Sequence, residues 1–184
     1  MDEIEIVPYD PDWPNLFATE AARLRDALEP GLIIGLEHFG STAVPGLAAK
    51  PIIDILIAVR DLETARSRMV VPLQRQGYAF WADNPKTDRL FFVKGLIFGE
   101  NGALEGARRT HHVHVAEPDA EPWRRLPFRD YLRAHPAEAL RYENLKRQLA
   151  VRYATDREAY TAAKEDFIGE ILAKAIVTHS SSKS

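Results

Sequence analysis

The segment "PIIDILIAV", residues 51–59, constrains the fold of this chain more than any other stretch. It is apolar on both faces of an extended backbone, which is typical of a strand buried inside a sheet. Asp54 interrupts the run, and an ionised carboxylate in such surroundings is costly unless something cationic meets it. The partner could be a basic side chain or Mg²⁺, which prefers oxygen ligands and substrate phosphates.

A glycine-serine turn precedes this strand. Residues 32–39, "LIIGLEHF", are expected to form a strand that runs into Gly40, Ser41 and Thr42. The backbone N–H groups of such a turn, the two hydroxyls and the positive end of a short following helix would form a cradle for phosphate. Lys50 adds a cation to the same unit. The alternative interpretation is a helix N-cap that holds no ligand.

The remaining segments alternate between strand and helix patterns. Pro72 is expected to bend or interrupt its helix, and the glycine-rich residues 95–109 are expected to form a mobile hairpin loop. Further strands are expected in "YAFWA", "RLFFVK" and "THHVHVAE", and helices over residues 14–29, 61–76, 128–135, 136–153 and 155–177.

Strands fill the first two-thirds of the chain, and helices follow from about residue 121. This order predicts an α+β fold class, with a small mixed β-sheet and a helical C-terminal cover. We expect residues 1–178 to form one domain and residues 179–184 to be a disordered tail.

Composition limits the classes of partner. The net charge of −3 gives no basic field for duplex nucleic acid, and the absence of cysteine removes thiolate zinc sites and thiol catalysis. The N-terminus lacks the apolar stretch of a signal peptide, and no segment approaches the ~20 apolar residues that cross a bilayer. We therefore expect a cytoplasmic protein with no membrane partner, and the oligomeric state stays open.

Several stretches together resemble the GrpB family. They are "GLEHFGSTAVPGLAAKPIIDILIAV", "RLFFVKG", "THHVHV", "FRDYLRAHPAEALRYENLKRQLA" and "YTAAKEDFI". The resemblance covers the chain from about Val7 to about Ile171. It implies a relationship to the nucleotidyltransferase superfamily that includes DNA polymerase β and the ppGpp synthetases. Domains of this family also occur fused to dephospho-CoA kinase, which associates them with coenzyme A or nucleotide metabolism.

The chain departs from the superfamily signature at one position. That signature has a Gly-Gly or Gly-Ser turn, a spacer of roughly ten residues and an acidic-apolar-acidic strand. Gly40-Ser41 and Asp54 match the first part, but Leu56 stands in place of the second carboxylate. Two-metal phosphoryl transfer needs several carboxylates, so the usual machinery is incomplete. Glu37 is a nearby carboxylate on the preceding strand.

The strand "HHVHV" offers other ligands. Residues two apart share a strand face, so His112 and His114 project together, away from His111. If this strand lies beside the aspartate strand, the two imidazoles and Asp54 form a site for a divalent ion, with Mg²⁺ or Mn²⁺ favoured and Zn²⁺ as an alternative. The other interpretation is that the histidines hydrogen-bond to substrate. His38 is expected to pack in the core.

Basic and aromatic residues in the later segments are candidates for substrate binding. Arg89 and Lys94 project from opposite faces of a regular strand, so only one can face the site. Tyr160 and Lys164 share a helix face, where a ring could stack on a base and an ammonium could bind its phosphate. The alternative is a solvated face. The candidates for phosphate or substrate binding are Gly40, Ser41, Thr42, Lys50, Arg89, Lys94, Arg129, Lys146, Tyr160 and Lys164.

These observations and the resemblance together predict a nucleotidyltransferase-like protein. It would act on a nucleotide or another phosphate-bearing small molecule, such as one related to coenzyme A. Asp54, His112 and His114 would be the catalytic and metal-binding residues. Two alternatives stay open: a nucleotide-binding or sensor module without chemistry, and a metal-dependent hydrolase that uses the same three side chains.

Overall fold

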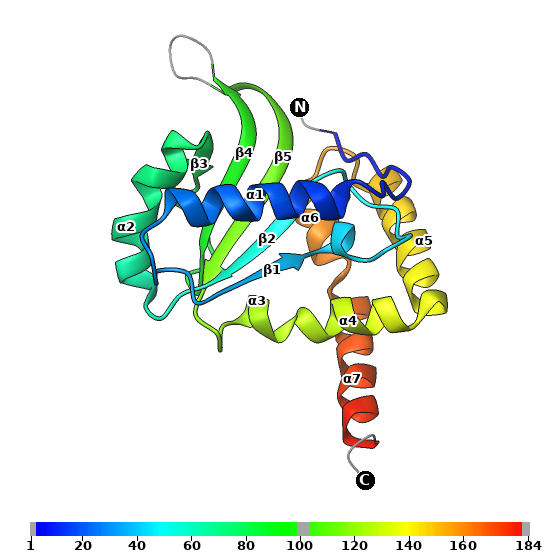
Figure 1. The fold of residues 1–184 in the computed structure, drawn as a ribbon. Helices are drawn as coiled ribbons and strands as arrows, with labels where there is room; N and C mark the ends of the chain where they lie inside the picture. Colours follow the sequence, from blue (N-terminus) through cyan, green and yellow to red (C-terminus); the bar gives the residue numbers. More distant parts are fainter. Residues whose placement is uncertain (1–2, 99–103, 182–184) are drawn as a thin grey trace.

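The computed structural model of the chain describes residues 3–98 and 104–181. Five strands form one sheet, and helices lie against it (Figure 1). The strands are β1 (Gly35–Phe39), β2 (Ile53–Ala58), β3 (Tyr78–Phe80), β4 (Leu90–Phe98) and β5 (Leu104–Ala116). The helices are α1 (Trp13–Ala27), α2 (Leu62–Arg75), α3 (Glu121–Arg124), α4 (Leu126–Ala134), α5 (Pro136–Arg152), α6 (Arg157–Ala162) and α7 (Glu165–Ser181), with one 3₁₀ turn, η1 (Ser41–Ala43).

The sheet is mixed, and its order is β1-β2-β5-β4-β3. β2 has a neighbour on each side: it pairs antiparallel with β1 and parallel with β5. β3 and β4 complete the sheet through antiparallel pairs. The apolar segment around Asp54 therefore lies inside the sheet, as its composition predicts. The α+β fold class with a mixed sheet is confirmed.

One face of the sheet forms the main hydrophobic core. Ile53, Ile55 and Ile57 of β2 point to this face and pack with residues of α1 and α2. These helices place their apolar stripes on the sheet, for example through Leu24 and Met69, which are fully buried. The opposite face carries Asp54, because successive side chains of a strand alternate.

The hairpin between β4 and β5 is more ordered than the glycine spacing indicates. The expected loop over residues 95–109 is wrong at both ends, because β4 continues to Phe98 and β5 begins at Leu104. Gly95 has a φ of 92° and lies at a register shift between the strands, where a side chain would collide with the Arg108 carbonyl. The glycine therefore serves a bulge. Residues 99–103 lie outside the described residues.

The last third of the chain is helical, as predicted. Several boundaries differ: the short helix α3 was not expected, α4 begins at Leu126, and the expected helix over residues 155–177 is divided into α6 and α7. Earlier in the chain, α2 continues through Pro72 without a break. α7 extends away from the sheet and continues to Ser181, beyond the expected end of the folded part at residue 178 (Figure 1). Residues 182–184 lie outside the described residues. Among the helices described, none is both long enough and apolar enough to cross a membrane.

A buried polar group joins α1 to the core face of the sheet. The Glu20 carboxylate, whose side chain is 3% exposed, accepts hydrogen bonds from Lys94 Nζ at 2.6 Å and from the Tyr78 hydroxyl at 3.0 Å. Lys94 pairs with His111 in the β4–β5 register, so it points away from Asp54. The prediction that Lys94 binds substrate is therefore wrong, because this ammonium neutralises a buried carboxylate on the other face.

Replacing Lys94 with methionine is expected to lower the free energy of unfolding by about 2 kcal/mol, because the Glu20 charge stays buried without its cation. Urea denaturation measures the change. The double variant Glu20→Gln/Lys94→Met should recover part of the loss, and Lys86→Met on a neighbouring loop should have little effect. An equal loss in the single and double variants would contradict this assignment.

Candidate functional site

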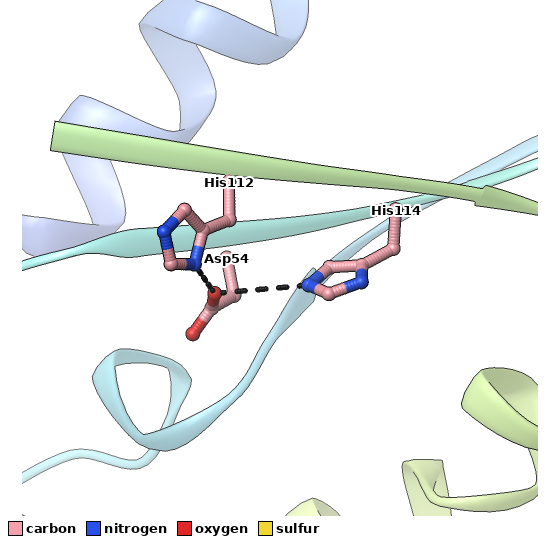
Figure 2. A group of neighbouring side chains, drawn as sticks. All are labelled: Asp54, His112 and His114. Carbon is pink, nitrogen blue, oxygen red and sulfur yellow. Dashed lines mark hydrogen bonds and ion pairs between the residues drawn. The ribbon is translucent and has the colours of Figure 1, made fainter. Parts of the chain in front are cut away.

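Asp54 meets both predicted histidines on the face of the sheet opposite the main core. In the register of the sheet, Asp54 lies between Phe39 of β1 and His112 of β5, and His114 occupies the next row on the same face. The Asp54 Oδ1 atom is 3.0 Å from His112 Nδ1 and 3.9 Å from His114 Nε2 (Figure 2). The parallel pairing of β2 with β5 thus brings these three side chains together.

The carboxylate also contacts the glycine-serine turn. Gly40 has φ 69° and ψ −170°, a region that residues with a side chain hardly enter. A β-carbon at this position would overlap the Asp54 carboxylate. Glycine is therefore required at position 40 for two reasons: the backbone conformation of the residue and the close approach of the Asp54 side chain. The turn and the aspartate form one unit, as the sequence predicts.

The site favours the ionised form of Asp54. Burial by itself would raise the pKa of the Asp54 carboxyl, but the hydrogen bond from His112 and the nearby His114 ring hold it well below its usual range. Burial lowers the pKa of His112, although Asp54 opposes this effect. The pair is thus a carboxylate and a neutral imidazole, with Nδ1–H donating to Asp54.

Two buried ring nitrogens at the site have no hydrogen-bond partner in the described structure: His112 Nε2 and His114 Nδ1. One donor atom from each of Asp54, His112 and His114 lies within 4.8 Å of the other two. Donors about 2.1 Å from one ion lie roughly 3 to 3.5 Å apart, so small movements would let these three side chains hold it. An ion on His112 Nδ1 would replace the hydrogen bond to Asp54.

A second carboxylate is not added by the neighbouring strands. Leu56 is fully buried in the row of His114, and Glu37 lies opposite it on β1. The Glu37 carboxylate accepts a hydrogen bond from Arg129 Nη1 at 2.8 Å, and the same nitrogen donates to the His38 carbonyl at 2.7 Å. The predicted role of Arg129 in substrate binding is therefore wrong: this guanidinium fastens α4 to β1.

The turn itself is built differently from the prediction. Thr42 is buried, and its hydroxyl lies 3.0 Å from His38 Nε2 and 3.3 Å from the Ile52 carbonyl. The hydroxyl is therefore committed to the structure and does not serve as a phosphate donor. The expected short helix is the single 3₁₀ turn η1, too short to supply a helix dipole. His38 stacks on Phe17, as expected for a core residue.

Three lysines, Lys50, Lys146 and Lys164, form a cluster over two buried rings; Lys146 Nζ lies 4.9 Å from the centre of the Tyr142 ring, and the other two lie over Tyr160. Lys50 Nζ and Lys164 Nζ lie 5.0 and 4.4 Å from the centre of the Tyr160 ring, within the range of cation–π attraction. Burial, with the charge of Lys164, lowers the pKa of Lys146 to about 7. Burial and the charge of Lys50 also lower the pKa of Lys164 to about 7, whereas Asp54 opposes the shift. Several ammonium groups thus repel one another beside the aspartate.

The members of this lysine cluster differ in exposure. Lys146 is 2% exposed and donates a hydrogen bond to the Ala48 carbonyl, whereas Lys50 and Lys164 are half-buried. Tyr160 is only 1% exposed. Its predicted stacking on a base is therefore wrong, because the ring is buried among the helices and supports the two lysines instead.

Arg89 faces the same side of the sheet as Asp54 but is committed to other groups. It pairs with Glu121 and, at 2.8 Å, with Asp88, and its side chain is 8% exposed. The predicted contact of Arg89 with substrate is therefore not supported, since its charge is neutralised by two carboxylates. These pairs attach the start of α3 to β4.

Three further residues, on α4, α5 and β4, support the site in ways that their sequence spacing did not reveal. Arg133 Nε donates to the Ala43 carbonyl at 2.9 Å, and the Tyr142 hydroxyl bonds with Ser41. The Phe91 ring lies 5.1 Å from that of His112 and 4.8 Å from that of His114. The alternation of side chains along "RLFFVK" was the sequence pattern that could have placed Phe91 on the same face as the site.

The two surface hollows that we describe do not coincide with the candidate site. One, of about 370 Å³, is lined by Tyr131 and α7, and another, of about 400 Å³, lies beside Asp61. Neither includes a predicted site residue. Solvent reaches the candidate site at Asp54, whose side chain is 25% exposed.

Comparisons with known proteins agree with the architecture. Residues 3–174 match the family described as GrpB protein. A UPF0157 protein of Pseudomonas aeruginosa is 52% identical over 177 residues, covering 95% of this chain and 69% of that protein. A dephospho-CoA kinase of Mycolicibacterium paratuberculosis is 32% identical over 189 residues, covering 94% of this chain and 46% of that protein. The crystal structure of conserved protein GrpB from Enterococcus faecalis is similar with a TM-score of 0.79 and 34% identity, over 95% of this chain and 99% of that chain.

The variant Gly40→Ala is expected to lower the free energy of unfolding by about 3 kcal/mol, from backbone strain and from the collision with Asp54. Gly31→Ala is the matched control, because Gly31 also has a positive φ, of 80°, but has open space at its β-carbon position. We expect about 1 kcal/mol there. Urea denaturation compares the two, and equal losses would show that Asp54 does not press on the turn.

Proposed function

The chain belongs to the GrpB family, and from that premise we propose that it binds a phosphate-bearing small molecule, such as a nucleotide, together with one divalent ion. The observation that carries this proposal is the meeting of Asp54, His112 and His114 at the Gly40-Ser41 turn, beside a lysine cluster. The dephospho-CoA kinase relative supports a nucleotide or a coenzyme A precursor as the ligand.

Asp54, His112 and His114 would hold the ion. Two imidazoles and one carboxylate suit Mn²⁺ and Zn²⁺ as well as, more weakly, Mg²⁺. When bound, the ion would polarise a phosphoryl oxygen. The donor set supports one ion, since Leu56 occupies the position of a second carboxylate and Glu37 is paired with Arg129.

The lysine cluster would neutralise the phosphates. Lys50 and Lys164 repel each other in the free protein, and an anion between them would replace this repulsion with attraction. The Ser41 hydroxyl, held by Tyr142, would orient a phosphate oxygen at the turn. Lys146 is too deeply buried for contact and acts through its charge. The reaction that suits these parts is nucleotidyl or phosphoryl transfer.

A second candidate function is binding without turnover. The single carboxylate favours it, because transfer reactions in the superfamily use several acidic ligands. A sensor should bind its nucleotide comparably in the presence of a chelator and should release no product. A hydrolase built on the same three side chains would instead need its ion for turnover. Product release from nucleotides with and without Mn²⁺ separates these functions.

Asp54→Ala is expected to abolish binding of Mn²⁺, and His112→Ala to weaken it at least about tenfold, because each removes a ligand. Isothermal titration calorimetry with the metal alone measures both. Glu37→Gln is the matched control: its carboxylate lies on the same face but is bound to Arg129, so affinity should stay within about twofold. A wild-type protein that takes up neither Mn²⁺ nor Zn²⁺ would refute the metal site.

Affinity for inorganic tripolyphosphate is expected to fall as the pH rises from about 6 to about 9, because the pKa values of Lys146 and Lys164 lie near 7 and only their charged forms attract the anion. Binding should therefore take up protons near neutral pH. Titration calorimetry in buffers of different ionisation enthalpy detects this uptake. Lys164→Met should reduce both effects; unchanged pH dependence in this variant would contradict the role of Lys164.

A further inference from the structure

An aromatic surface continues from the histidines toward the edge of the sheet. Phe91 of β4 contacts both His112 and His114, and the ring of Trp81 lies 5.8 Å from that of Phe91. Trp81 follows directly after β3, the edge strand. The rings thus form a continuous row from the candidate metal ligands to the last strand.

The backbone sets the side of the sheet to which Trp81 points. The Trp81 N–H donates to the Phe91 carbonyl at 3.0 Å, which continues the pairing of β3 with β4. Phe80 packs on Phe92 in the main core, so the next side chain along the strand points to the opposite face. Trp81 therefore lies on the face of Asp54.

Trp81 is 44% exposed, and it is the only aromatic residue among the large apolar side chains that are exposed in the described part of the chain. An indole that contacts a second ring and is partly exposed can stack on a planar group. Its position beside a charged site, rather than its exposure alone, distinguishes it from the other exposed apolar residues.

The arrangement matches the two ends of a nucleotide. Lys50 precedes β2, whereas Trp81 follows β3, and β5 and β4 lie between these strands. Neighbouring strands are about 4.8 Å apart, so Trp81, which lies beside Phe91 in the row of His114, is about 10 Å across the strands from this candidate metal ligand. A chain of phosphates at the lysines and the ion, followed by a sugar, would place a base near the opposite end of this row.

We propose that Trp81, supported by Phe91, is the platform on which the base of a nucleotide stacks. This inference rests on the proposed function and narrows its substrate class to nucleotides, as against sugar phosphates or inorganic polyphosphates. Stacking on one indole tolerates any base, since every base presents a planar face. The site thus selects for the presence of a base more than for its identity.

The test compares ATP with inorganic tripolyphosphate, each in the presence of Mn²⁺, by titration calorimetry. Trp81→Leu keeps an apolar side chain but removes the ring, and it should weaken ATP binding about tenfold while leaving tripolyphosphate unchanged. Trp81→Phe keeps a smaller ring and should retain most of the affinity. ATP should also quench tryptophan fluorescence in the wild type and in Trp123→Phe, but not in Trp81→Phe.

The outcomes separate this inference from the proposed function. If ATP and tripolyphosphate bind equally well, or if Trp81→Leu binds ATP as the wild type does, the proposal that a base stacks on Trp81 is wrong. The proposed phosphate site would be unaffected. If neither compound binds the wild type, both proposals fail. Trp81→Leu could also change the sedimentation coefficient while ATP affinity stays unchanged. That result would assign Trp81 to a contact between copies of the chain and would overturn its proposed role in base stacking.

Discussion

The hydrogen bond from His112 to Asp54, between neighbouring parallel strands, is the interaction on which the candidate site depends. An ionised carboxylate on a buried apolar strand is tolerated only where donors reach it. The donors come from a strand about sixty residues further along the chain, so the sheet must be assembled before the charge is satisfied. A shift of one residue in this register would turn both histidines to the other face.

The two faces of the sheet differ in how their buried polar groups are matched. The face under α1 and α2 is an apolar core whose buried Glu20 is matched by Lys94 and Tyr78. On the other face, two imidazole nitrogens lack partners and several lysines repel one another. The buried carboxylate of the first face has its donors, whereas the second face gathers unpaired ring nitrogens and mutually repelling cations, a contrast that motivates the proposed site.

Local patterns were sufficient for most elements and for the face of each strand residue, because alternation is a property of the backbone. They did not reveal the strands on each side of Gly95 or the division between α6 and α7. They correctly put His112 with His114 and Arg89 apart from Lys94. They could not show which face Lys94 occupies, since that depends on pairing with β5 and on Glu20, which is distant in sequence. The burial of Tyr160 depends likewise on contacts between helices, which helical spacing alone does not reveal.

Lys50, Lys146 and Lys164 come from three separate parts of the chain: the approach to β2, the middle of α5 and the link between α6 and α7. In the free protein, charge repulsion among them would weaken the packing of the helical cover on the sheet. A polyanion bound among the three lysines would attract all of them and so join the C-terminal helices and the sheet into one cooperative unit. Amide hydrogen exchange in α5 to α7 would then be slower when the polyanion is bound.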